Sequence, residues 1–158
     1  AKIAQAAEFI NKMPKKYESK ISEGGTNVSG GQRQRLSIAR AVAKEPEIFV
    51  FDDAFSALDM KTDRLLRAAL KEVTKESVVL VVAQRINTIR DAEQIIVLDQ
   101  GKIVGRGTHY ELLKRCKVYL EIAKSQFSDE ELAAELAVSS KVGALEVVQN
   151  REKQKGEK

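Results

Sequence analysis

Apolar residues recur along this chain at helical spacing over several stretches. Helices are predicted where residues three and four positions apart are apolar and a capping residue or a proline marks an end. Ser29, Asp59, Thr108 and Ser128 are the predicted caps, and Pro14 ends the first helix. The predicted helices run over Ala1–Asn11, from Ser29 to Val42, Met60–Lys75, near Ile86–Asp91, Thr108–Ala123 and onward from Ser128. Lys15–Asn27 is predicted to be an ordered polar loop.

Continuous apolar runs predict strands instead. Ile48–Phe51 and Ser77–Ala83 have the composition of strands buried on both faces of a parallel sheet. Gln94–Leu98 and Lys102–Gly105 are two short predicted strands that flank the turn sequence Asp-Gln-Gly, which predicts a hairpin. The predicted fold class is therefore α/β with a parallel sheet core. Leu65, Leu66, Ala69, Leu70 and Val73 are expected to form the buried face of the central helix.

Composition narrows the possible classes of protein. The chain has 158 residues and a net charge of +4, too small to indicate nucleic-acid binding. It contains no apolar run of membrane-spanning length and no signal-peptide layout at its start. Cys116 is the single cysteine, expected as a half-buried residue of a helix, and this usage fits a reducing, cytosolic setting. His109, the single histidine, is expected to serve in capping or packing rather than in metal binding.

Two stretches carry candidate chemistry. Ser29-Gly30-Gly31 leads into a helix, and a helix N-terminus with free N–H groups attracts anions such as phosphate. Taken alone, this pattern is equally compatible with an ordinary loop-to-helix transition. Asp52 and Asp53 follow a buried strand, the position at which an open α/β sheet binds its ligands. A solvated loop start is the alternative reading of this acidic pair.

The order of these motifs resembles the nucleotide-binding domain of ABC transporters, in its C-terminal part and of the exporter type. The resemblance runs from Ala1 to about Ser125. It lies in ISEGGTN before the signature, the signature VSGGQRQRLSIARA, the Walker B strand IFVFDD, the D-loop SALD, the switch VAQRINTI and the hairpin and helix of DQGKIVGRGTHYELL. It implies the fold of a P-loop NTPase. The implied domains are residues 1–127, the ATPase part, and 128–158, a helical, charged tail.

The resemblance implies ATP and Mg²⁺ as cofactors. Two such domains pair head to tail, and the signature of one covers the γ-phosphate bound by the other. Ser29, Gly31 and Gln32, with Gly30 in the same turn, are implied to contact that phosphate. Asp52 is implied to hold Mg²⁺ through water, and Asp59 to brace the dimer interface.

Three departures from the family pattern shape the expected activity. The sequence contains no G-x-x-x-x-G-K-[ST], so the chain is expected to be a piece that starts after the P-loop. Asp53 stands where the family usually has a catalytic Glu, and Gln84 stands where it has a switch histidine. A shorter carboxylate and a group that does not carry a proton near pH 7 predict slow hydrolysis. Phe55 also replaces a usual small polar residue.

These departures match the degenerate subunit of a heterodimeric exporter, whose intact signature serves the partner's ATP. The implied partners are a second nucleotide-binding domain and transmembrane domains, at the cytoplasmic side of the cell membrane. The alternatives are a homodimeric ATPase with a drifted but active site, a soluble ABC-type ATPase of DNA repair or translation, and a non-catalytic module. Without the first strands of the full sheet, we expect an exposed apolar sheet face or edge.

Overall fold

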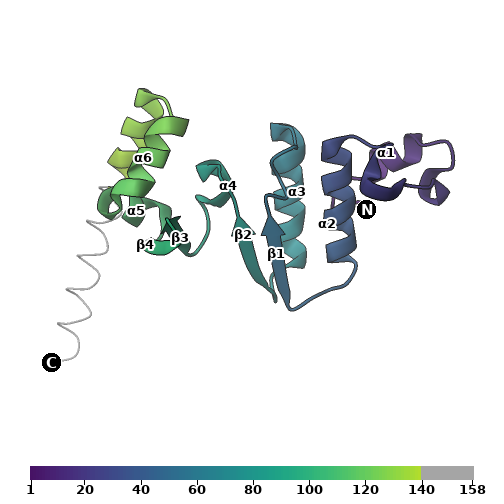
Figure 1. Cartoon of the computed structure of the whole chain (residues 1–158), viewed down its shortest axis with the longest axis horizontal. Coiled ribbons are helices and arrows are strands. Elements are labelled where there is room, and N and C mark those ends of the chain that lie inside the picture. The colour runs from purple at the N-terminus through teal and green to yellow at the C-terminus, as the bar shows by residue number, and fades with distance from the viewer. Residues whose placement is uncertain (140–158) are drawn as a thin grey trace. The chain divides into compact units, whose positions relative to one another are not determined.

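The computed structural model describes residues 1–139. The sequence-predicted continuation over Val142–Val148 and the charged end Arg151–Lys158 lie outside the described residues. The chain divides into two compact units, Ala1–Val82 and Ala83 onward (Figure 1). Within residues 1–139, no helix is long and apolar enough to cross a membrane.

The N-terminal unit opens with a turn rather than with the predicted helix from Ala1. Helix α1 spans Ala7–Lys12. Gln5 adopts a left-handed backbone with a φ of 54°, which a continuous α-helix does not allow, so the first residues form a separate turn. The predicted end is confirmed, because Met13 before Pro14 is extended with a ψ of 149°.

The polar stretch after α1 is ordered, as predicted, and contains two 3₁₀ turns, η1 (Lys16–Glu18) and η2 (Glu23–Gly25). Gly24 and Gly25 both have positive φ, 69° and 66°, which glycine adopts without steric cost. The Arg33 guanidinium, from the helix that follows, donates to the Gly24 carbonyl at 2.8 Å. The glycine turn is thereby fixed to that helix.

Strands β1 (Ile48–Asp52) and β2 (Val78–Val82) pair in parallel, which confirms the predicted core topology. The register sets Ile48 beside Val78 and Asp52 beside Val82. Helices α2 (Gly30–Val42) and α3 (Met60–Val73) lie beside one another next to β1 (Figure 1). A single apolar cluster joins them, and its buried members are Ala4, Ile38, Phe49, Phe51, Phe55, Leu58, Leu66 and Leu70.

The expectation that both strands are buried on two faces is wrong for this chain. The residues of β1 alternate between buried and exposed, and β2 is exposed along most of its length. Ile48 is 61% exposed, Val50 62% and Val78 64%. The cause is that the two helices cover one face only. The expected exposed apolar sheet face is therefore confirmed.

Helix α3 is capped by Asp59, as predicted, and ends two residues before the predicted Lys75. Leu66 and Leu70 are buried, but Leu65 and Val73 are 48% and 42% exposed, contrary to the expectation for this face. The buried stripe is narrower than predicted, since α3 packs against one sheet face and α2 only.

The C-terminal unit contains the predicted hairpin of β3 (Ile95–Asp99) and β4 (Lys102–Gly107). Gln100 and Gly101 have φ values of 47° and 75°, so both central residues are left-handed, as in the type I′ turns that favour hairpins. The short helix α4 spans Ile86–Ile89. A second apolar cluster holds this unit together, built from Ile86, Ile95, Val97, Leu112, Leu113, Cys116, Tyr119, Ala123 and Leu132.

The helix predicted over Thr108–Ala123 is two helices, α5 (His109–Arg115) and α6 (Lys117–Gln126). The break falls at Cys116, which has an extended backbone and is 7% exposed, so the cysteine is buried and lies outside a helix, contrary to expectation. Its sulfur lies where a side chain on Gly105 would be, 2.7 Å from an ideal Cβ. This packing between β4 and the helix pair accounts for the break.

The two predicted capping boxes of this unit are present. Thr108 Oγ1 accepts from the N–H of Glu111 to open α5, and the Ser128 and Glu131 pair opens the helical stretch 129–139. His109 is 1% exposed, and its Nδ1 lies 2.8 Å from the Tyr119 hydroxyl. The expected packing role of His109 is thus confirmed.

Candidate functional site

The candidate phosphate-facing turn is the start of α2. Ser29 Oγ accepts from the N–H of Gln32 at 3.2 Å, and Gln32 Oε1 accepts from the N–H of Ser29 at 2.9 Å. The expected cap is therefore a reciprocal capping box, whose second half the sequence analysis missed. The Ser-x-x-Gln spacing of residues 29 to 32 is the sequence pattern that indicates this second half.

The capping box leaves hydrogen-bond donors available at this helix end. Within residues 1–139, the Ser29 hydroxyl donates to no acceptor, and neither does the Gln32 side-chain nitrogen. A hydroxyl carries one donor and a side-chain amide carries two. Together with the free N–H groups of the first turn, they form a donor set suited to an anion.

A close contact within the chain requires a glycine at position 31. A Cβ built on it would lie 2.8 Å from the carbonyl oxygen of Ala57, whereas one on Gly30 would lie 3.7 Å from the Ala57 Cβ. The first distance is a clash with backbone and the second an ordinary contact. Gly31 thus allows α2 to touch the loop that follows β1.

Asp52 and Asp53 lie at the carboxyl end of β1, as predicted, and both are exposed. Asp53 has a left-handed φ of 48°, and its N–H donates to the Val82 carbonyl at 3.0 Å. The chain therefore turns sharply at Asp53 while still bonded to β2. Such a strained backbone needs support from neighbouring groups.

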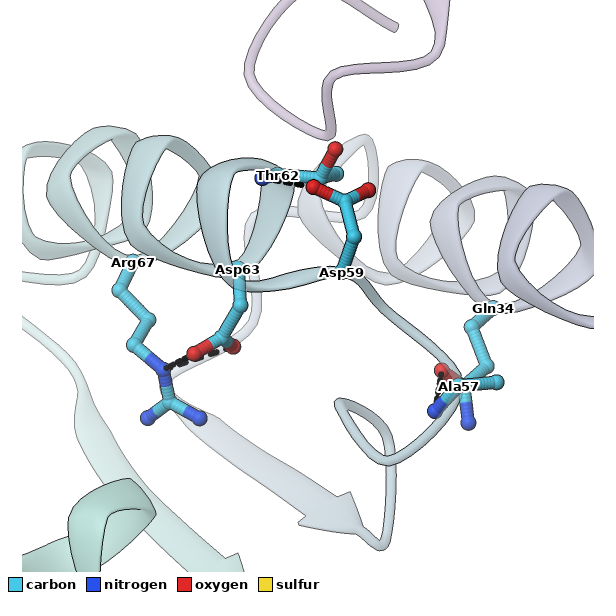
Figure 2. A network of polar contacts seen from close by, with 6 residues as sticks. All are labelled: Gln34, Ala57, Asp59, Thr62, Asp63 and Arg67. Carbon is cyan, nitrogen blue, oxygen red and sulfur yellow. Dashed lines mark hydrogen bonds and ion pairs between the residues drawn. The ribbon is translucent and has the colours of Figure 1, made fainter.

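That support comes from Gln34, which the sequence analysis did not single out (Figure 2). Its Nε2 donates to the Asp53 carbonyl and to Ser56 Oγ, each at 3.2 Å, and its Oε1 accepts from the N–H of Ala57 at 3.1 Å. One amide thus ties α2 to both ends of the loop after β1. The sequence indicated this role only through the position of Gln34, one helical turn after Gly30 and Gly31.

Asp59 closes this loop and begins α3. Its carboxylate accepts from the N–H of Thr62 at 2.9 Å (Figure 2). Hydrogen bonding to the side chain of Thr62, and next to its backbone, lowers the pKa of Asp59. One turn later Asp63 pairs with Arg67 at 2.8 Å, and the guanidinium lies 4.4 Å from the centre of the Phe55 ring. Phe55 is 7% exposed, so at this position it belongs to the core.

Seven of the eight candidate residues lie in the N-terminal unit. These are Ser29, Gly30, Gly31, Gln32, Asp52, Asp53 and Asp59. The eighth, Gln84, belongs to the C-terminal unit and is exposed. Within residues 1–139 no three or more His, Cys, Asp or Glu side chains are grouped to hold a metal ion. A magnesium ion at Asp52 would thus take most of its ligands from water and phosphate, as this ion commonly does.

Comparisons with known proteins agree with this arrangement. The family model described as ABC transporter matches residues 1–56. An uncharacterized ABC transporter ATP-binding protein of Mycobacterium tuberculosis is 54% identical over 109 residues, 69% of this chain and 19% of that protein. An ATP-dependent lipid A-core flippase of Photobacterium profundum is 46% identical over 129 residues, 82% of this chain and 22% of that protein.

A solved structure extends the likeness to the fold. A bacterial Atm1-family ABC exporter with ATP bound superposes with a TM-score of 0.77 at 37% identity, over 82% of this chain and 23% of that chain. The chain belongs to the ABC transporter ATP-binding family. Its fold is that of the ABC-type P-loop NTPases, which confirms the predicted fold class. The chain spans about a fifth of the length of the curated relatives it matches.

Proposed function

We propose that this chain forms part of the ATP-binding and hydrolysing module that powers an ABC exporter. The observation that carries the proposal is the contact of the Ser29–Gln32 turn with the loop after β1 through Gly31 and Gln34. That contact fixes the anion-binding helix end against the loop that follows the acidic strand end, so one unit holds both features in a set arrangement. Phosphoryl transfer depends mainly on such positioning and on charge stabilisation.

In this proposal each candidate residue has one role. Ser29, Gly30, Gly31 and Gln32 present donors to the γ-phosphate of an ATP bound chiefly by a partner domain. Asp52 holds Mg²⁺ through water. The remaining roles are those of Asp53 as carboxylate beside the attacking water, Gln84 as a hydrogen-bonding group at the phosphate, and Asp59 as a brace of the domain interface.

The proposed setting follows from the same family. The partners are a second nucleotide-binding domain, paired head to tail, and the transmembrane domains of the transporter. The module lies at the cytoplasmic side of the cell membrane. Residues 1–127 form the ATPase part in this proposal, and residues 128–158 form an added charged tail.

We further propose that the site containing Asp53 and Gln84 is the degenerate one of a heterodimeric exporter. Asp53 is one methylene shorter than glutamate, and Gln84 does not carry a proton near pH 7. A displacement of about 1 Å at a catalytic group costs roughly a hundredfold in rate. This site would retain ATP and hydrolyse it slowly, while the signature turn supports hydrolysis at the other site.

The test compares two substitutions in the assembled transporter. Gly30→Ala adds a methyl group to the turn at ordinary contact distance from the Ala57 Cβ, whereas a Cβ at position 31 would clash with the Ala57 carbonyl. We expect Gly30→Ala to lower ATPase turnover about a hundredfold, because a methyl group at this turn would displace the phosphate by about 1 Å. Asp53→Asn is expected to change turnover by less than about threefold, since slow hydrolysis there contributes little.

Equal losses from Gly30→Ala and Asp53→Asn would contradict the degenerate site and favour a drifted but active ATPase. An unchanged turnover in the Gly30→Ala transporter would contradict the proposed role of the signature turn. Lys61→Ala, an exposed change on α3, serves as the control for expression and assembly.

A further inference from the structure

The segment that carries Gln84 is held at its start by a side chain from the far end of α6. Gln126 Nε2 donates to the Gln84 carbonyl at 2.7 Å, and Gln126 Oε1 accepts from the N–H of Ile86 at 2.9 Å. These two backbone groups flank Arg85, at the bend between β2 and α4. One amide therefore fixes both sides of the bend from which the Gln84 side chain projects.

The same segment is held at its end by the helical stretch 129–139. Arg90, the residue that closes α4, pairs with Glu135 through Nη2 and Oε1 at 2.8 Å. The other carboxylate oxygen of Glu135 lies 3.4 Å from His109 Nε2. The Glu135 side chain is 15% exposed and that of Arg90 33%, so this ion pair is partly shielded from solvent.

The two contacts come from one continuous piece of chain. Gln126 is the last residue of α6, and the Ser128 and Glu131 capping box starts the next helical stretch immediately afterwards. Lys114 Nζ also bonds the Ser139 carbonyl, and Ser139 Oγ donates to the Tyr110 carbonyl at 2.8 Å. The stretch 129–139 is therefore fixed to α5 as well as to Arg90.

We propose that Gln126 and Glu135 are positioning residues for Gln84, acting through the backbone of residues 84–90. The inference rests on the proposed role of Gln84 at a nucleotide phosphate. It gives a task to the helical stretch after Ser128, which lies beyond the family motifs. A side chain that meets a phosphate must be held within a fraction of an ångström, and supporting contacts of this kind supply that precision.

The experiment measures the segment and the nucleotide separately, in the assembled transporter. Gln126→Glu preserves shape and one acceptor but turns an oxygen toward the Gln84 carbonyl, and Gln126→Met removes both hydrogen bonds. Amide hydrogen exchange over residues 84–90 reports the segment. The rate at which labelled ATP leaves the site that contains Gln84 reports the nucleotide.

We expect exchange over residues 84–90 to accelerate roughly tenfold in both Gln126 variants and less in Glu135→Gln. ATP release is expected to accelerate in the same order, with little further change when Gln84→Ala is added, since residues that act together are not additive. Lys124→Gln and Glu130→Gln carry the same charge changes on exposed positions of the same helices and should leave both readouts unchanged.

Unchanged exchange over residues 84–90 in both Gln126 variants would overturn the inference. So would faster exchange without faster ATP release, provided that Gln84→Ala alone speeds release. If Gln84→Ala alone leaves release unchanged, the proposed function of Gln84 itself has failed, and the inference falls with it. The two failures are therefore distinguishable by the single Gln84→Ala variant.

Discussion

Each unit of this chain uses a glutamine amide to fix a loop that follows a parallel strand. In the N-terminal unit Gln34 bonds to Asp53, Ser56 and Ala57, which lie 19 to 23 residues away. In the C-terminal unit Gln126 bonds to Gln84 and Ile86, 42 and 40 residues away. A side-chain amide suits this task because it donates and accepts at once.

The two units differ in the other contacts that hold the loop bonded by the glutamine. The loop after β1 also packs directly against α2, because the absence of a side chain at Gly31 allows the Ala57 backbone to approach the helix closely. The two ends of the Gln84 segment are instead held by side chains, Gln126 at its start and the Arg90–Glu135 ion pair at its end. The loop after β1 is thus fixed by the motifs themselves, whereas the Gln84 segment is fixed by a part of the chain outside any motif.

The largest expected effect comes from a substitution at Gly31, where the added methyl group would meet backbone rather than a side chain. Gly31→Ala should destabilise the N-terminal unit by about 1–3 kcal/mol, because the Ala57 backbone has no easy way to move aside. Gly30→Ala is the matched control, with the same gain in helix propensity and no clash. Urea unfolding of each variant gives the free energies.

Gly105→Ala should have a similar initial cost in the C-terminal unit, since its Cβ would meet the Cys116 sulfur at 2.7 Å. Adding Cys116→Ala should recover part of that loss, because the obstacle is a side chain. If the Gly105→Ala, Cys116→Ala double variant recovers none of the lost free energy of unfolding, the proposed difference between backbone and side-chain contacts is wrong.

A smaller effect is expected from Gln34→Met, which keeps the length of the side chain and removes its three hydrogen bonds. The loss should be about 1 kcal/mol, because the exposed loop groups can turn to water instead. Hydrogen exchange should accelerate roughly fivefold over residues 53–58 and stay constant over residues 84–90. Faster exchange in both segments would show that the Gln34 and Gln126 contacts are not independent.

The smallest expected effect is a pH dependence confined to the C-terminal unit. Burial lowers the pKa of His109 from its ordinary value of 6.5, an effect that Glu135 opposes in part. The unfolded chain therefore binds this proton more readily than the folded one. The stability contribution is complete above pH 6.5 and is lost as pH falls from there through the lower pKa of the folded state.

Urea unfolding across pH 5 to 8 tests this, with tyrosine fluorescence as the probe in a Tyr17→Phe background. The remaining tyrosines, Tyr110 and Tyr119, lie in the C-terminal unit. His109→Gln should flatten the profile between pH 5 and 6.5. A profile that is unaltered by His109→Gln would assign the pH dependence to other groups.

Local patterns predicted most of the elements and the ends that caps define. Ser29, Asp59 and Thr108 cap the helices they were expected to cap, because a cap depends on residues within one turn. The hairpin turn at Gln100 and Gly101 was equally local. The helix start at Ala1 and the unbroken helix through Cys116 were wrong, because a left-handed Gln5 and the packing of Gly105 on Cys116 override helix-compatible sequence.

The sequence by itself determined the motif order, the caps and the acidic strand end, since each depends on neighbours along the chain. Only the tertiary structure decided which glutamines hold the two loops, why Gly31 is glycine, and which sheet face stays exposed. Gln126 and Gln84 meet across 42 residues, and no pattern within a window of sequence encodes such a contact. Hydrogen-bond partners at that separation are chosen by packing, which brings α6 and α4 of the C-terminal unit together.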